Sequence, residues 1–148
     1  MVYSKESLTS EILFDLLKRV NNSFFHEPLS VRVDLENYAK KLAHYAKHFS
    51  CFENLKLIGV VCCYMNDLVS KIAYMSVTCI DPAFQRKRIG QKLTKMCEDE
   101  AINKGFSFVD LEIHSQNTPI IKMHKKLGFY IYRKENESFF MRKNLLRE

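Results

Sequence analysis

Two consecutive stretches of this chain are apolar on both of their alternating faces, and this pattern restricts the fold more than any other feature. Residues 57–65 read Leu-Ile-Gly-Val-Val-Cys-Cys-Tyr-Met, and residues 72–80 are rich in β-forming side chains. Successive side chains of a strand point to opposite faces, so a strand without polar alternation must be covered on both of them. The chain is therefore predicted to build a central sheet with helices packed on each side.

The remaining periodicity predicts the elements around that sheet. Helices are expected at residues 8–20, 35–48, 89–104 and 118–126, and strands at 49–52, 57–65, 72–80, 106–113, 129–133 and 138–143. Ser7 or Thr9 would cap the first helix and Asp34 the second, and Gly105 would end the third. This order describes a mixed α/β (α+β) protein in which two helices precede three antiparallel strands. Its length of 148 residues fits one domain, spanning 1–148.

The composition is that of a globular protein with a basic balance. The hydrophobic fraction is 47% and the charged fraction 27%, which is enough apolar material for a core. No apolar run approaches the roughly 20 residues of a membrane span, and the first ten residues contain no apolar signal region, so a cytoplasmic location is expected. The formal net charge of +6 attracts anions without identifying which ones.

The cysteines and histidines do not predict a metal site. Cys62 and Cys63 are adjacent, and neighbouring residues of a strand cannot both line one site. The five cysteines are therefore expected to be reduced core residues. His26, His44 and His48 are irregularly spaced, and the last two are expected on a solvated helix face among lysines.

A basic loop connects the strand at 72–80 to the helix at 89–104. Arg86, Lys87, Arg88 and Lys92 fall within seven positions at the start of that helix. A helix N-terminus presents unpaired N–H groups at the positive end of the helix dipole, which suits phosphate. On charge clustering alone, a solvated helix start without a ligand is the favoured interpretation.

The sequence around this loop resembles the acyl-CoA-binding motif of GNAT acetyltransferases. In that family a strand and a proline precede Gln/Arg-x-x-Gly-x-Gly/Ala, and here Gln85 to Gly90 fill the pattern with Arg88 in place of the middle glycine. The second half of the pattern, close to Asn-x-x-Ala-Ile-x-Leu-Tyr-x-Lys-x-Gly-Phe, resembles residues 117–129. The resemblance covers roughly residues 57–143. The N-terminal third, which shapes the acceptor site in these enzymes, departs from it, and the usual first strand is not recognised there.

The resemblance implies a GNAT fold, with a central mixed, mostly antiparallel sheet flanked by helices. It also implies transfer of an acetyl group from acetyl-CoA to an amine by direct attack on the thioester, without a metal. It assigns cofactor binding to Thr78, Cys79, Ile80, Gln85, Arg86, Lys87, Arg88, Ile89, Gly90, Gln91 and Asn117. The Arg88 side chain would either crowd the phosphates or pair with them, and binding is expected to be retained.

The family's chemistry needs a base for the amine and benefits from an acid for the thiolate. Glu112 is the predicted base, because apolar neighbours would bury it partly and raise its pKa; pairing with a lysine is the alternative. His124 stands where the family usually has tyrosine and is the predicted acid. Tyr130, Tyr74 and solvent are the alternatives for that role. Cys79 is expected to contact the cofactor arm or the core rather than to act as a nucleophile.

The sequence does not identify the amine that accepts the acetyl group. Sugar amines, polyamines, aminoglycosides, amino acids and protein N-termini all fit, and the basic balance favours a small molecule such as a nucleotide-linked amino sugar. A protein or peptide N-acetyltransferase and a non-catalytic acyl-CoA-binding module are the alternatives. No nucleic-acid partner is expected, because only Phe84 interleaves with the basic loop, and no membrane partner is expected. Phe139, Phe140 and Met141 would allow a homodimer through the C-terminal strands.

Overall fold

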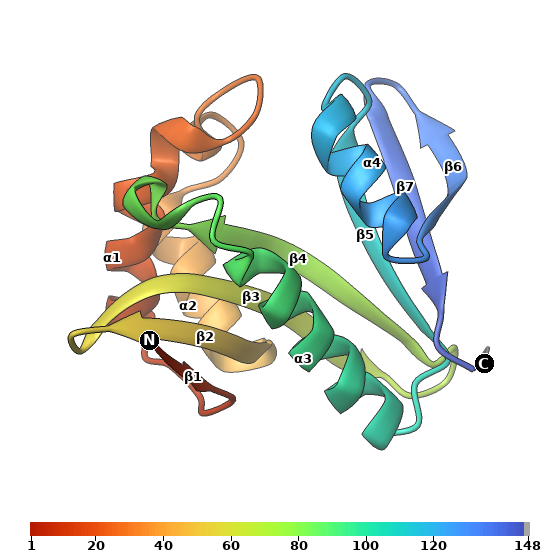
Figure 1. Ribbon diagram of the computed structural model, residues 1–148, viewed down its shortest axis with the longest axis horizontal. Helices are drawn as coiled ribbons and strands as arrows, with labels where there is room; N and C mark the ends of the chain where they lie inside the picture. Colours follow the sequence, from red (N-terminus) through yellow and green to blue (C-terminus); the bar gives the residue numbers. More distant parts are fainter. Residues whose placement is uncertain (147–148) are drawn as a thin grey trace.

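The computed structural model describes residues 1–146 and contains one seven-stranded sheet (Figure 1). The strand order is β1-β2-β3-β4-β5-β7-β6, and only β4 and β5 are parallel neighbours. The strands are β1 (Val2–Ser4), β2 (Lys47–Glu53), β3 (Lys56–Asp67), β4 (Ile72–Ile80), β5 (Phe108–His114), β6 (Tyr130–Glu135) and β7 (Ser138–Asn144). The helices are α1 (Ser10–Val20), α2 (Leu35–Tyr45), α3 (Ile89–Asn103) and α4 (Thr118–Lys126), with short 3-10 turns η1 (Asn21–Ser23), η2 (Leu29–Val31) and η3 (Pro82–Phe84). The predicted mixed, mostly antiparallel α/β architecture is confirmed.

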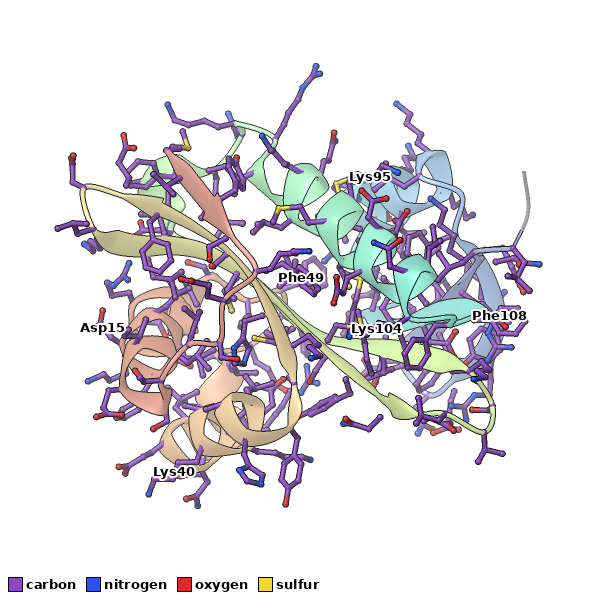
Figure 2. The ribbon with its side chains drawn as sticks, turned by 90° about the horizontal axis from the view of Figure 1, so that it is seen from below. Asp15, Lys40, Phe49, Lys95, Lys104 and Phe108 are labelled. Carbon is purple, nitrogen blue, oxygen red and sulfur yellow. The ribbon has the colours of Figure 1, made fainter. Side chains whose placement is uncertain are left out.

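Helices cover both faces of the sheet, as the apolar strands require. Helices α3 and α4 lie on one face, and α1 and α2 lie on the other (Figures 1 and 2). The neighbours Val60 and Val61 on β3 belong to two separate hydrophobic clusters, one under each helix pair. Cys62 and Cys63 divide between the clusters in the same way, and all five cysteines are buried and free, as predicted.

The helix pair α1 and α2 packs over β3 and β4, and His48 on β2 bonds to Leu42 of α2. On the same face, the side chains of Glu112, Tyr132 and Arg133 on β5 and β6 are exposed. The sheet therefore keeps one uncovered polar surface beside the end of α1. Within residues 1–146, no helix is both long and apolar enough to cross a bilayer.

A glycine on β3 sets how closely α3 approaches the sheet. A Cβ atom at Gly59 would lie 3.0 Å from Ile80 Cδ1 and 3.2 Å from Ile89 Cγ2. Both distances are shorter than ordinary van der Waals contact, so a side chain at this position would push α3 away. Because Ile89 is the first residue of α3, this close approach also fixes the position of the basic loop that leads into the helix.

The N-terminal third differs from the sequence prediction at several points, and its first helix begins at Ser10 rather than at residue 8. The chain does contain a first strand, β1, which is only three residues long and pairs antiparallel with β2 at the edge of the sheet. The second helix ends at Tyr45, because Ala46 is extended, and not at residue 48. His48 is consequently buried in β2 rather than exposed on a helix. The caps Thr9 and Asp34 are confirmed, whereas Ser7 is not used.

His48 holds the two N-terminal helices against the sheet. Its Nδ1 accepts the backbone N–H of Leu8 at 2.9 Å, and its Nε2 lies 2.8 Å from the carbonyl oxygen of Leu42 in α2. With one nitrogen accepting, the other carries the single proton of a neutral ring and donates it to Leu42. Burial lowers the pKa of His48, and the bond to Leu42 opposes that shift only in part. The folded protein therefore favours the neutral ring.

Acid is expected to destabilise the fold through this histidine. The folded pKa of His48 lies below its unfolded value of about 6.5, so its contribution is complete above that pH and is lost as the pH falls through and below it. Urea unfolding should therefore show a free energy of unfolding that declines as the pH is lowered from about 6.5. His48→Met should flatten the decline, while costing about 1–3 kcal/mol at neutral pH for each backbone group left unpaired. His44→Gln, an exposed change on α2, is the matched control, and an equal flattening there would contradict the assignment.

The strands β4 and β5 separate part-way along the sheet. They pair in parallel only at Ile72 with Phe108, Ala73 with Val109, and Tyr74 with Asp110. Beyond these positions β4 continues to Ile80 and β5 to His114 without pairing to each other. The backbone N–H and C=O groups that face each other across this gap are not paired with one another, so they can form hydrogen bonds to a ligand.

Candidate active site

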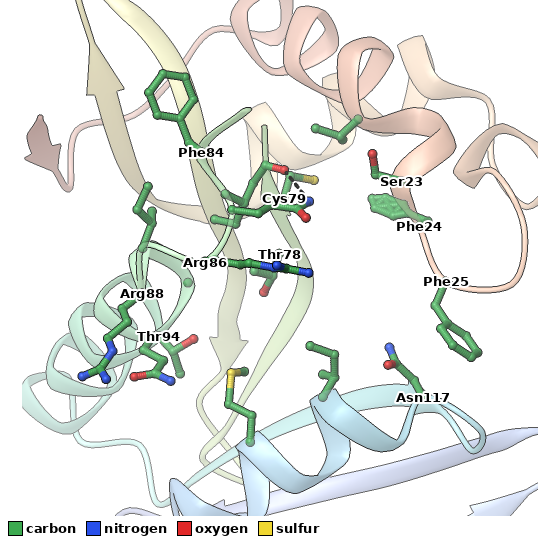
Figure 3. Close-up of a pocket in the computed structure, with 18 of the residues that line it drawn as sticks. Ser23, Phe24, Phe25, Thr78, Cys79, Phe84, Arg86, Arg88, Thr94 and Asn117 are labelled. Atoms are coloured by element: carbon green, nitrogen blue, oxygen red, sulfur yellow. Dashed lines mark hydrogen bonds between the residues drawn. The ribbon is translucent and has the colours of Figure 1, made fainter. Parts of the chain in front are cut away.

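A cavity of about 650 Å³ lies between the end of β4 and helix α4, on the side of the sheet where β4 and β5 no longer pair. One wall is the end of β4 together with the basic loop and the first turn of α3, and the opposite wall is α4 with Asn117 before it (Figure 3). The end of α1 and the segment after it close a third side. Both halves of the GNAT-like sequence pattern therefore line one space. Of the residues predicted to bind the cofactor, those in the cavity wall are Thr78, Cys79, Ile80, Gln85, Arg86, Arg88, Ile89, Gly90, Gln91 and Asn117.

The basic loop has a backbone suited to an anion. Arg86 and Arg88 both adopt the left-handed conformation, with φ of 66° and 60°. Successive N–H groups in such turns form anion-binding concavities. Arg88 is the N-cap residue of α3 and makes no side-chain capping bond to the described residues, so the first N–H groups of the helix face the cavity without a protein acceptor. Glycine usually holds such a conformation at lower cost, and here arginine adopts it.

The side chains of the basic loop point in different directions. Arg86 extends into the cavity, whereas Arg88 turns away from its centre along α3 (Figure 3). Lys87 is exposed and is not part of the wall, and the Lys92 ammonium lies 4.2 Å from the centre of the Tyr3 ring. The Arg88 side chain therefore does not crowd the cavity, and Arg86 brings the charge nearest to it.

An ion pair with α1 anchors the loop at its start. The Arg19 guanidinium donates to Asp81 at 2.5 Å and to the carbonyl oxygen of Leu57 at 2.7 Å. The same Asp81 carboxylate accepts the N–H of Ala83 at 3.0 Å and so caps η3. Because α1 also ends at the cavity, this pair joins the loop side of the cavity to the segment that closes its third side.

The end of β4 presents one exposed and one buried side chain to this space. Thr78 is exposed toward the gap, and Cys79 is buried in the cluster beneath α1 and α2. Burial raises the pKa of the Cys79 thiol to about 12. A thiol with that pKa is almost entirely protonated at neutral pH, which disfavours Cys79 as a nucleophile. Its contact with the cofactor stays a prediction.

His124 lies on the inner face of α4 and is buried, not exposed on the helix surface. Its Nδ1 is 3.0 Å from the carbonyl oxygen of Ile120, and its ring packs edge-on against Phe129. Burial lowers the pKa of His124, partly opposed by the bond to Ile120. In the neutral ring the proton is on Nδ1 and is donated to Ile120. His124 can therefore protonate a thiolate from Nε2 only as the imidazolium.

This geometry makes the effect of His124→Phe depend on pH. If His124 is the acid, the ratio of wild-type to variant kcat should be largest near about pH 6 and approach one above about pH 8, because the imidazolium disappears as the pH rises. Steady-state rates at saturating acetyl-CoA across this range measure the ratio. A ratio that does not change with pH would mean that the substitution acts through packing against Phe129 and that the acid is another group.

Glu112 does not have the buried environment that the sequence predicts. Its side chain is exposed, and its Oε2 accepts the Ser138 hydroxyl at 2.5 Å. The reason is alternation: Leu111 and Ile113 point into the core beneath α4, so Glu112 points to the uncovered face. It is not part of the cavity wall itself. It lies on β5 beyond the last residue that pairs with β4, on the uncovered face beside the gap.

The two alternative acids lie in unequal positions. Tyr74 is half-buried on β4 at the point where the strands part. Burial, and next the Glu112 carboxylate, raise the pKa of Tyr74, so it keeps its proton at neutral pH. Tyr130 is exposed on β6, two strands away from the gap. Of these two, only Tyr74 adjoins the opening.

Several wall residues carry no signal in the sequence. Ser23, Phe24 and Phe25 follow α1 and close the third side of the cavity (Figure 3). They belong to no motif, and they come from the third of the chain where the resemblance is poorest. Thr94 on α3 also lines the cavity although it is buried among apolar neighbours.

Comparison with known families identifies this arrangement. A family model described as "Acetyltransferase (GNAT) family" matches residues 11–129. The chain belongs to the GNAT acetyltransferase family. As a GNAT acetyltransferase it takes acetyl-CoA as its acyl donor. The cavity fits that molecule, since a Cβ atom at Gly90 would meet nothing within 4 Å and the Arg88 side chain caps none of the first N–H groups of α3.

One curated relative gives a more specific comparison. The chain is 36% identical over 84 residues to the N-terminal acetyltransferase B complex catalytic subunit NAA20 of Arabidopsis thaliana. The match covers 51% of this GNAT chain and 48% of that protein, so it spans about half the length of the relative.

Solved structures share the fold over nearly the whole chain. The PaiA N-acetyltransferase of Thermoplasma acidophilum, crystallised with coenzyme A, superposes with a TM-score of 0.74 at 19% identity and covers 97% of this chain and 99% of that one. Aminoglycoside 6'-acetyltransferase type Ii superposes with a TM-score of 0.80 at 14% identity, covering 100% and 99%. At these identities the likeness concerns the fold alone.

Proposed function

We propose that this GNAT acetyltransferase transfers the acetyl group to the α-amine of a polypeptide N-terminus. The observation that carries the proposal is the identity of 36% over 84 residues with the catalytic subunit of an N-terminal acetyltransferase complex. A family member that acts on polypeptides needs an open approach to the thioester. The uncovered face of β5 and β6, with Glu112, Tyr132 and Arg133 exposed, offers such an approach beside the gap.

A small-molecule acceptor is the weaker candidate. The basic balance of the chain favours a phosphorylated amino sugar, but Arg86 and Arg88 lie at the cavity wall expected to hold the cofactor phosphates. Part of the positive charge therefore has a proposed role that does not involve an anionic acceptor. On the uncovered face, Asp110 is paired with Arg142 at 2.7 Å and Arg133 with Glu135 at 2.7 Å, so these two arginines are already paired within the chain.

The chemistry is a direct transfer. The amine gives up a proton to Glu112, directly or through a water, and its nitrogen forms a bond to the acetyl carbon. The carbon–sulfur bond then breaks, and the thiolate takes up a proton and leaves as CoA. The cofactor loop, from Gln85 to Gln91, would hold the pyrophosphate during these steps with the N–H groups of α3. A cytoplasmic location stays a prediction.

The packing of the C-terminal strands does not support the homodimer that the sequence allows. Met141 is buried in the core, and the Arg133 guanidinium lies 3.9 Å from the centre of the Phe140 ring. Strand β7 is enclosed between β5 and β6. These apolar side chains are used within the chain, so a homodimer stays a prediction without support from them.

The first experiment is a calorimetric titration with acetyl-CoA and with CoA, followed by an acceptor screen that detects the released thiol. The screen pairs peptides that have a free N-terminus with the same peptides acetylated beforehand, all without lysine, beside amino sugars and polyamines. Turnover only with free N-termini is the expected result. Turnover with amino sugars alone would overturn the acceptor assignment. Tight binding without any turnover would favour the non-catalytic acyl-CoA-binding module.

A further inference from the structure

Three side chains from distant parts of the sequence meet beside the end of β5. They are His26 in the segment between η1 and η2, His114 at the end of β5, and Glu137 in the turn between β6 and β7. One ligand atom of each lies within 4.8 Å of the others. We propose that these three side chains form a binding site for a divalent transition-metal ion, best suited to Zn²⁺.

The backbone holds two of the three ligands in place. The N–H of Ser115 donates to the carbonyl oxygen of Glu137 at 2.8 Å, so the turn is fixed against the end of β5. The rings of His26 and His114 lie 4.7 Å apart between their centres. Tetrahedral Zn²⁺ with ligands at about 2.0–2.1 Å needs its ligand atoms roughly 3.3 Å apart. His26 and Glu137 are exposed, so their side chains can move inward by the remaining distance.

His114 carries a ring nitrogen that lacks a hydrogen-bond partner. Its Nε2 is buried without one among the described residues, and the nearest carboxylate oxygen, Glu137 Oε2, is 4.0 Å away. A buried polar atom without a partner costs free energy that a ligand can recover. A metal ion between the two groups would satisfy both, and it would take the place of a proton on Nε2.

The other nitrogen of His114 sets a limit on the affinity. Its Nδ1 accepts the N–H of Gln116 at 3.1 Å, whereas a metal-bound imidazole normally donates a proton from that position. Binding at Nε2 therefore requires the Gln116 amide to turn to water. Gln116 is exposed in a turn, so the cost is about that of one hydrogen bond, and we expect micromolar rather than tighter affinity.

The donor set selects the ion. Two imidazoles and one carboxylate with room for water match Zn²⁺ sites that keep an open position. Calcium and magnesium prefer oxygen ligands. The cysteines, which would compete for Zn²⁺, are all buried in the two cores.

A metal ion at this site would also affect the wall of the cavity that the segment after α1 forms. The segment that carries His26 also carries Phe24 and Phe25, which line the cavity, and the Phe25 ring lies 5.2 Å from that of His114. A bound ion would tie this segment, which comes from the α1 side of the gap, to β5 and β7 on the other side. Acetyl transfer itself uses no metal in this scheme.

The test is a calorimetric titration of the metal-free, full-length protein with ZnCl₂, repeated with His26→Ala, His114→Ala and Glu137→Gln. We expect one ion per chain and a loss of affinity of at least about tenfold in each variant. His44→Ala removes an exposed histidine far from the cluster and should bind as the wild type does. Equal affinity in the wild type and in His26→Ala, or no binding to the wild type, would overturn the site. Thiolate bands in the Co²⁺ absorption spectrum would overturn it as well, because they would locate the ion at cysteine.

Discussion

Gly90→Asp is expected to weaken acetyl-CoA binding by about 1000-fold. Gly90 is the second residue of α3, and a Cβ atom there meets nothing within 4 Å, so a carboxylate would project into the space proposed for the pyrophosphate. Two unit charges about 4 Å apart near a protein surface repel by about 4 kcal/mol. Each 1.4 kcal/mol changes an equilibrium constant tenfold. Calorimetric titration of the wild type and the variant measures the loss.

The same substitution should not unfold the protein. An acidic residue in the first turn of a helix interacts favourably with the helix dipole, and aspartate has a higher helix propensity than glycine. Gly90→Asn, of nearly the same shape without the charge, is the matched control and should bind far more tightly than Gly90→Asp. Equal weakening by both would mean that steric crowding is responsible. Wild-type affinity for acetyl-CoA in Gly90→Asp would show that the loop from Gln85 to Gln91 does not bind the cofactor.

The elements around the cofactor loop could be predicted because their signals are local. The strand at 72–80 and the helix at 118–126 have the predicted bounds, since apolar periodicity, Pro82 and Pro119 punctuate them. The walls on either side of the gap follow from the order of these elements. The family resemblance is visible in the sequence for the same reason, because both of its motifs lie at the ends of these well-marked elements.

The N-terminal third could not be predicted in the same way, because its structure depends on contacts across the chain. The lysines beside His48 in the sequence predict an exposed side chain. Its burial follows from bonds to Leu8 and Leu42, which no local pattern contains. Phe24 and Phe25 likewise reach the cavity only because α1 packs beneath β4. The cluster of His26 with His114 and Glu137 arises from three segments that meet only in the folded chain.

The exposure of Glu112 also depends on packing that the local sequence does not reveal. Its apolar neighbours predict burial, but they are buried because they alternate with it across β5. A strand covered on one face only would have Glu112 on the uncovered side. Recognising that case requires knowing that α1 and α2 stop over β4, and this depends on the helix packing rather than on the strand sequence.

Glu112→Gln is expected to lower kcat by about 100-fold, because the amide cannot accept a proton from the acceptor amine. This value is at the lower end of the range for proton transfer by a positioned side chain, since an exposed base acts through water. The amide keeps a hydrogen bond to Ser138, so the fold should be unaffected. Acetyl-CoA affinity should stay within about twofold, since Glu112 is outside the cavity wall. Glu135→Gln, another exposed glutamate on the same sheet, is the control and should leave kcat unchanged.

The dependence on pH separates a base from a mere contact in this variant. If Glu112 removes the proton, the deficit should shrink as the pH rises, because more of the acceptor amine is then already deprotonated and less depends on the base. Rates at saturating acceptor measure this from about pH 7 to about pH 9, around the α-amino pKa. A deficit that is constant across this range, with the KM of the acceptor raised instead, would make Glu112 a residue that binds the cationic amine. Rates equal to those of the wild type at every pH would exclude both roles and leave Tyr74, at the point where β4 and β5 part, as the next group to test.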